Sequence, residues 1–156
     1  MSRQLRAGPT SLERLETAID RLLQKHGFSR VEGDRPAFPA GLSALLLTED
    51  PQRNLEVLDA CVILPEALKP LADRISRWVA GPDFAAPLMQ QYGVARAPAV
   101  VFLRDGLFVG SLNGIRDWNE YRDEVNRLLN SPVQVALVKK TIAIPVRIAA
   151  APGACA

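Results

Sequence analysis

The stretch that decides the fold is YGVARAPAVVFLRDGLFVGSLNG, residues 92–114. It contains two short apolar runs rich in β-branched and aromatic residues, 99–103 and 107–112, separated by Arg-Asp-Gly at 104–106. Asp-Gly between two such runs is a strong hairpin signal, because a tight turn requires positive φ and glycine accepts it without a Cβ clash. Pro98 precedes the first run, where a proline removes no hydrogen bond from the strand interior. The stretch therefore predicts two antiparallel strands that are entered through a proline.

Helix and strand signals alternate in the first half of the chain. Thr10 and Glu13 have the spacing of a capping box, and they precede apolar residues at helical steps that end at Gly27. Residues 28–31 predict a short strand, and the nearly continuous apolar run 42–48 (LSALLLT) predicts a central strand covered on both faces. Residues 54–72 have a helical pattern, which we expect to kink or split at Pro65 because proline lacks an N–H and clashes with the preceding turn.

The second half continues the alternation and closes it. Residues 75–80 (ISRWVA) predict a strand, residues 87–91 a short helix that Gly93 ends, and residues 118–129 a final helix capped by Asp117. Strands that alternate with helices and close on a hairpin predict an α/β sandwich, with a mixed central sheet flanked by helices. We expect a loose N-terminus at residues 1–11, one domain at 12–130, and a C-terminal extension at 131–156.

The extension is apolar and β-prone at 133–138 and 141–148, but Pro145 and an Ala/Pro/Gly ending disfavour a regular element. Packing on a sheet edge, binding to another chain and disorder are equal alternatives for it. The extension holds three of the 19 basic residues and none of the 17 acidic ones, so 16 against 17 leaves residues 1–130 at −1.

Composition bounds the function. Hydrophobic residues make up 48% and charged residues 23%, which is ordinary for a globular protein. Neither clustered Lys/Arg with aromatics nor a long apolar span occurs, so no nucleic acid and no membrane insertion are expected. The start, MSRQLRAGPTSLERLE, has no signal-peptide h-region, and a cytoplasmic location is the default expectation. Two distant cysteines and one histidine predict no metal site and no disulfide framework, and we expect no cofactor.

The opening stretch is similar to the C-terminal half of a thioredoxin fold: Tyr-Gly-Val, a three-residue gap, proline, a strand, Asp-Gly, a second strand and Asn-Gly. This resemblance covers residues 12–130 and implies that Pro98 is the cis-proline facing the redox motif, although composition alone does not decide between cis and trans. The motif position reads TEDPQRN at 48–54 and has no thiol. Cys61 falls about two turns into the next helix, where a cysteine is usually a small buried hydrophobe. Dithiol exchange, which needs a thiolate and a resolving partner, is not expected.

A thioredoxin presents an exposed backbone edge before its cis-proline, and this edge pairs with extended peptides. Here the edge would be residues 96–98, bordered by residues 50–53 and 113–115, with carboxylates that would attract a basic peptide. On spacing alone, a solvated face with charges at a helix N-terminus is the simpler interpretation of these carboxylates. The predicted peptide-binding residues are Glu49, Asp50, Arg53, Glu56, Ala97, Pro98, Asn113 and Ile115; Asp59 adds acidity.

A closer resemblance favours the binding interpretation. Asp-Pro-x-Arg at 50–53, Leu-Pro-Glu-x-Leu at 64–68, Tyr-Gly-Val-x-Arg-x-Pro-Ala at 92–99 and the segment 112–118 resemble the hydrogenase expression/formation family of HyaE, HupG and HoxO. The resemblance implies a non-enzymatic assembly chaperone for uptake nickel–iron hydrogenase. Its expected partner is the hydrogenase small subunit, with its twin-arginine signal peptide, bound in the cytoplasm before export. Two alternatives remain: a cysteine-less interaction domain with another client, and a single-thiol reductase or peroxidase that acts through Cys61.

Overall fold

The computed structural model describes residues 8–33, 35–114 and 117–130. The C-terminal extension and the predicted site residue Ile115 lie outside the described residues. The elements, in chain order, are α1 (Ser11–Lys25), β1 (Ser29–Arg30), β2 (Leu42–Leu47), α2 (Glu56–Leu68), the 3₁₀ turn η1 (Lys69–Leu71), β3 (Ile75–Ala80), α3 (Pro82–Tyr92), β4 (Ala99–Arg104), β5 (Leu107–Asn113) and α4 (Trp118–Leu129).

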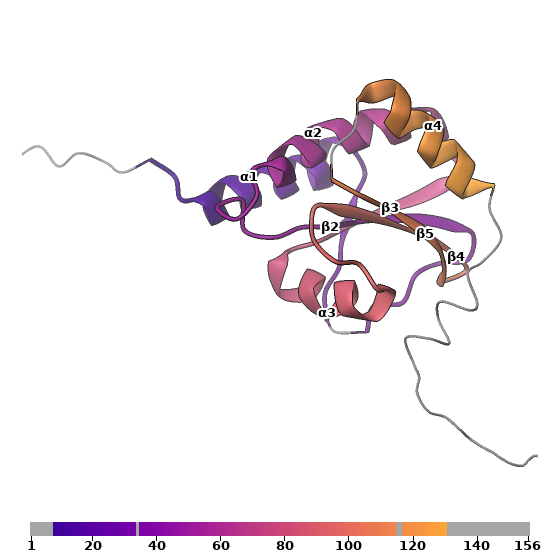
Figure 1. Ribbon diagram of the computed structural model, residues 1–156, viewed down its shortest axis with the longest axis horizontal. Coiled ribbons are helices and arrows are strands. Elements are labelled where there is room, and N and C mark those ends of the chain that lie inside the picture. The colour runs from indigo at the N-terminus through magenta and orange to yellow at the C-terminus, as the bar shows by residue number, and fades with distance from the viewer. Residues whose placement is uncertain (1–7, 34, 115–116, 131–156) are drawn as a thin grey trace, which may run out of the picture.

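The strands form one five-stranded sheet in the order β1-β3-β2-β4-β5. β3 pairs in parallel with β1 and β2, whereas β4 pairs antiparallel with β2 and β5, so the sheet is mixed. Figure 1 shows α1, α2 and α4 on one face and α3 on the other. The predicted α/β three-layer sandwich of the thioredoxin type is confirmed, with β2 at its centre and residues 43–47 of that strand buried.

The hairpin is built as its sequence predicts. Asp105 and Gly106 have φ of 53° and 79°, and positive φ at both central residues is what a two-residue hairpin loop needs. The register between β4 and β5 shifts by one residue, which leaves Val109 as a bulge. Beside it, a Cβ on Gly110 would lie 2.5 Å from Cδ2 of Leu128. The absence of a side chain at Gly110 therefore lets α4 pack directly on the end of the sheet.

α1 begins with the predicted capping box: the Thr10 side chain accepts a hydrogen bond from the Glu13 N–H, and the Glu13 side chain accepts one from the Thr10 N–H. Its apolar face, which includes Leu15, Ile19 and Leu22, is fully buried against the sheet layer. Because α1 is anchored at this end, its first turn is a fixed wall beside the C-terminal ends of β2 and β3. No helix in the described part of the chain is long and apolar enough to span a bilayer.

Two helix predictions need correction. α2 is not split at Pro65 but continues to Leu68, because Leu64 and Leu68 on either side of the proline are fully buried and hold the helix on the sheet. The regular helix ends where η1 begins, one residue before Pro70. α3 begins at Pro82 rather than Pro87: Pro82 takes the first-turn position that tolerates a missing N–H, and Pro87 lies exposed inside the helix.

Candidate functional site

An open groove of about 550 Å³ lies where the first turn of α1, the β2–α2 loop, α3 and the segment before β4 meet. Its floor follows the C-terminal ends of β2 and β3, which run in parallel to the same edge of the sheet. The charged residues that line it are Glu49, Asp50, Arg53, Asp83 and Arg96. The apolar residues that line it are Leu12, Pro82, Ala86, Met89 and Ala95. The groove therefore combines carboxylates, guanidinium groups and apolar surface in one concave face.

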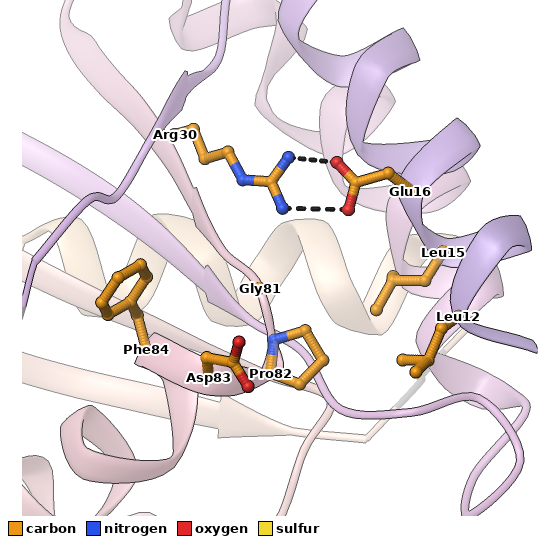
Figure 2. Close-up of a pocket in the computed structure, with 8 residues that line it drawn as sticks. All are labelled: Leu12, Leu15, Glu16, Arg30, Gly81, Pro82, Asp83 and Phe84. Atoms are coloured by element: carbon orange, nitrogen blue, oxygen red, sulfur yellow. Dashed lines mark hydrogen bonds and ion pairs between the residues drawn. The ribbon is translucent and has the colours of Figure 1, made fainter.

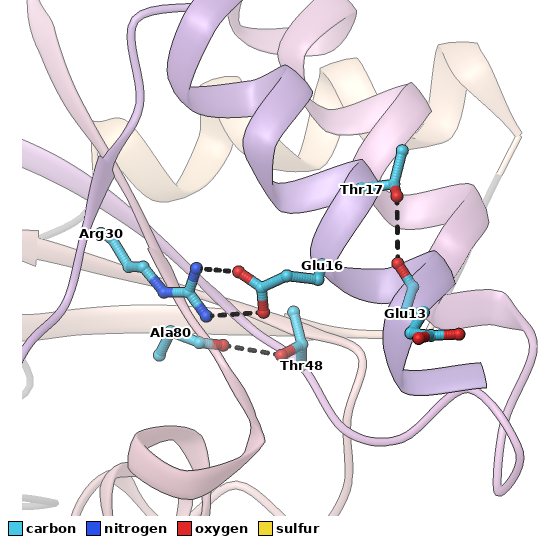
Figure 3. Close-up of polar contacts among 6 residues, drawn as sticks. All are labelled: Glu13, Glu16, Thr17, Arg30, Thr48 and Ala80. Atoms are coloured by element: carbon cyan, nitrogen blue, oxygen red, sulfur yellow. Dashed lines mark hydrogen bonds and ion pairs between the residues drawn. The ribbon is translucent and has the colours of Figure 1, made fainter. Parts of the chain in front are cut away.

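The strand ends beneath the groove are tied together by Thr48. Its hydroxyl Oγ1 donates to the carbonyl oxygen of Ala80 over 2.7 Å, and its own N–H donates to the same oxygen over 3.3 Å (Figure 3). Thr48 is 1% exposed, so these bonds are shielded from water. Because Glu49 and Asp50 follow directly, the strand end fixes where both carboxylates leave the sheet.

Asp50 is held by several contacts. Its Oδ1 accepts a hydrogen bond from the Ser11 hydroxyl and another from the Gln52 N–H, while its carbonyl oxygen accepts from the Arg53 N–H over 2.9 Å. The Ser11 bond is the largest cause that lowers the pKa of Asp50 below its ordinary value, followed by the Gln52 bond and the Arg53 charge. Asp50 is therefore an anion at neutral pH, and it joins α1 to the β2–α2 loop.

The backbone beside Pro98 differs from the predicted exposed edge. The Ala97–Pro98 peptide bond is cis. Ala97 is 0% exposed and Pro98 is buried, so neither offers an open edge. The carbonyl oxygen of Ala97 accepts a hydrogen bond from Asn54 Nδ2 over 3.4 Å, and that of Pro98 accepts from the Gly114 N–H over 2.8 Å. The prediction of an exposed backbone edge at Ala97 and Pro98 is therefore wrong, because both residues are buried by other groups of the protein.

Asn54 and Asn113 make that cover. Asn54 bonds to Ala97 through its amide nitrogen, and its Oδ1 accepts from the N–H of Glu56 over 3.0 Å at the start of α2. Asn113 donates from Nδ2 to the carbonyl oxygen of Arg96 over 3.2 Å. The two asparagines therefore each donate to a backbone carbonyl, at residues 96 and 97, that an incoming strand would approach.

The structure sorts the other predicted site residues into two places. Glu49, Asp50 and Arg53 line the groove together. Glu56 is exposed and lies outside it, with Oε1 3.6 Å from the position that a Cβ on Gly114 would take. Asn113 acts on the backbone of Arg96 rather than in the groove.

The sequence reasoning missed Asp83 and Asn54. For Asp83 a signal existed, since Gly-Pro-Asp follows a predicted strand that would run parallel to its neighbour, and the carboxyl ends of parallel strands meet at one edge. For Asn54 the only signal was its place just before a predicted helix, where asparagine often caps the first N–H groups.

The groove offers no thiol for disulfide exchange. Its lining contains neither cysteine nor histidine. Cys61 is on the buried side of α2, 6% exposed, which confirms its prediction as a core residue, and burial raises the pKa of its thiol to about 12. Among the residues that the structure describes, no three His, Cys, Asp or Glu side chains gather as a metal site would require.

We expect Asn54→Ala to lower the free energy of unfolding by about 1–3 kcal/mol, because it leaves the buried carbonyl of Ala97 without its donor and the N–H of Glu56 without its acceptor. Asn54→Asp keeps the acceptor and loses only the donor, so its loss should be smaller. Urea denaturation of the three proteins measures both. Equal stability of the wild type and Asn54→Ala would contradict the bridging role.

The mixed sheet, the cis-proline before β4 and a groove that lacks thiols at the redox-motif position define a thioredoxin-like protein without the dithiol. The chain belongs to the HyaE family: residues 18–121 match the family model described as "Hydrogenase-1 expression protein HyaE".

Named relatives agree with this membership. The hydrogenase expression/formation protein HoxO of Cupriavidus necator is 35% identical over 88% of this chain and 86% of its own. The hydrogenase expression/formation protein HupG of Rhodobacter capsulatus is 32% identical over 71% of this chain and 83% of its own. Among solved structures, thioredoxin from Aeropyrum pernix is 22% identical, with a TM-score of 0.44 over 56% of this chain and 75% of that one.

Proposed function

We propose that this protein is a non-catalytic chaperone for the assembly of uptake nickel–iron hydrogenase. It holds the hydrogenase small subunit through its twin-arginine signal peptide, in the cytoplasm and before export. Membership of a family whose named members are hydrogenase expression/formation proteins supports the assignment to hydrogenase maturation. The observation that carries the proposal is the groove itself, which places three carboxylates and no thiol where a thioredoxin performs its chemistry.

The charges of the groove suit a basic, extended segment. Glu49, Asp50 and Asp83 line it, and hydrogen bonds from arginine to carboxylate are charge-assisted and stronger than neutral ones. Arg53 and Arg96 stand in the same lining, so the groove is a mixed surface with an acidic excess rather than a uniformly acidic one. Such a surface recognises the position of charges and not only their sign, because a misplaced arginine would meet a guanidinium.

The covered backbone at residues 96–98 changes how the client would bind. Because Ala97 is fully buried, and because Asn54 and Asn113 already donate to the carbonyl groups of Ala97 and Arg96, a client strand could pair at that edge only after the edge had been uncovered. Recognition by side chains in the groove needs no such displacement. We therefore assign client binding to the groove between α1 and α3, with Glu49, Asp50 and Asp83 as its acidic residues.

Titration of the small-subunit signal peptide against the protein by calorimetry at low salt tests the proposal. We expect saturable binding that weakens as salt rises, because salt screens charges at the surface. A peptide with both arginines replaced by glutamine should bind at least tenfold more weakly. Absence of binding at low salt, or equal binding of the two peptides, would count against the proposal.

The other candidate is a cysteine-less interaction domain with a different client. A second twin-arginine signal peptide, of equal net charge but from an unrelated exported protein, separates the two. Weaker binding of this peptide supports a hydrogenase-specific chaperone. Equal binding of both supports the broader interaction domain.

A further inference from the structure

A second cavity, of about 270 Å³, opens between α1 and the turn from β3 to α3 (Figure 2). It shares Leu12, Pro82 and Asp83 with the groove described above. The two are therefore neighbouring compartments of one surface that share these three residues as lining. We call the second one the apolar compartment, defined by Leu12, Leu15, Pro82 and Phe84.

Two charged side chains at the rim of the apolar compartment, Arg30 and Glu16, are already paired with each other. Arg30 and Glu16 form a two-pronged ion pair, with a 3.0 Å bond from Nη2 to Oε1, and this pair lowers the pKa of Glu16 (Figures 2 and 3). Nη2 of Arg30 is also 3.2 Å from the position that a Cβ on Gly81 would take, so the guanidinium lies against the turn. A visiting charge finds little to bind at the Arg30–Glu16 pair, and apart from Asp83 the other side chains that line the cavity are apolar: Leu12, Leu15, Pro82 and Phe84.

One wall of the apolar compartment is the side chain of Leu12, which stays exposed to solvent in the folded protein. Leu12 is 50% exposed, although it is in the first turn of a helix whose next apolar residue, Leu15, is 1% exposed. A single exposed leucine is common on protein surfaces. Leu12, however, lines both compartments, so an apolar group placed there would cover it from either side.

Asp83 marks the boundary between the two compartments. It is exposed, and within the described part of the chain it forms no salt bridge. Figure 2 shows its carboxylate between Phe84 and Pro82, with no partner drawn to it. A cation at Asp83 would therefore have apolar surface directly beside it.

We infer that the client is read at two adjacent points: Asp83 takes a basic side chain, and the apolar compartment takes a large aliphatic or aromatic side chain two positions away. The spacing follows from geometry, because residues i and i+2 of an extended segment point to the same side. The inference rests on the proposed function and adds the chemistry of the recognised segment. A basic residue without an apolar neighbour at this spacing is a poor ligand.

Two labelled octapeptides test this by fluorescence anisotropy. One carries two consecutive arginines and a leucine two positions after the second; the other has serine in place of the leucine. We expect the wild type to bind the leucine peptide about tenfold more tightly, as burial of part of a leucine side chain predicts. Leu12→Ser should reduce this preference to about threefold or less. Leu107→Ser is the matched control, since Leu107 is 49% exposed and belongs to the β4–β5 hairpin.

Leu12→Ala serves as a second variant, and circular dichroism of all variants verifies folding. An unchanged preference in both Leu12 variants overturns the inference, as does equal binding of the two peptides by the wild type. If that equal binding is weakened by Asp83→Lys, the proposed function stands and only the apolar compartment is wrong. If neither octapeptide nor the small-subunit signal peptide binds the wild type, the proposed function itself fails.

Discussion

Cys61 should react with a disulfide reagent at neutral pH at least about a hundredfold more slowly in the folded protein than in the unfolded chain. The thiolate is the nucleophile, and burial raises the pKa of this thiol to about 12. At neutral pH the folded protein therefore has far less thiolate than the unfolded chain. Its 6% exposure slows the reagent further.

The measurement follows release of the chromophore of an aromatic disulfide from the Cys155→Ser variant, in which Cys61 is the sole remaining cysteine. Addition of denaturant should release one equivalent promptly. Prompt release of the chromophore from the folded protein would instead support the alternative function of a single-thiol reductase or peroxidase. In the same background, Cys61→Ala should leave client binding unchanged, because the groove contains no sulfur from Cys61.

Reversal of one charge, Asp83→Lys, should weaken binding of the small-subunit signal peptide by about thirtyfold at low salt. Two unit charges 4 Å apart in water interact by about 1 kcal/mol, so reversing the sign of one changes the interaction by about 2 kcal/mol. The effect should shrink at high salt because the site is open to solvent. Since Asp83 is in the first turn of α3, the variant also loses up to about 1 kcal/mol of stability, and binding is best measured well below its melting temperature.

Asp73→Lys is the matched control for this charge reversal. Asp73 is also exposed, but it precedes the first residue of β3, whereas Asp83 follows the last one, so the two carboxylates lie at opposite ends of the strand. Both variants change the net charge equally. If the two variants weaken binding of the signal peptide equally, the binding depends on the total charge of the protein and not on the charges in the groove.

The parts of the fold that could be predicted are those encoded locally. Asp105 and Gly106 determine the hairpin turn through their own backbone angles. Thr10 and Glu13, which are three residues apart, determine the start of α1 through the two hydrogen bonds between them. The apolar run 42–48 indicated an interior strand because strands inside an α/β sheet are covered by helices on both faces, whereas a strand with one solvated face alternates apolar and polar residues.

The proline effects could not be predicted, because they depend on packing. Pro65 removes one helix hydrogen bond, yet α2 is held on the sheet by buried residues whose partners are on distant strands. Pro82 and Pro87 compete for the start of α3, and the sequence does not show which of them directly follows the end of β3.

The candidate site was predicted in part for the same reason. Glu49, Asp50 and Arg53 follow one strand, so their proximity is local. The cover of the cis-proline segment comes from Asn54, which is 43 residues from Ala97 in sequence, and no local pattern reports such a bond. Asp83 joins the groove only because β3 is the immediate neighbour of β2.

The most direct test of the central claim, that the groove binds the client without thiol chemistry, is an NMR titration of the ¹⁵N-labelled protein with the small-subunit signal peptide. We predict that the largest backbone shifts occur at residues 48–53, 83–89 and 95–96, and that β5 and α4 change little. Largest shifts on β5 or α4, with the groove residues unchanged, would contradict the account.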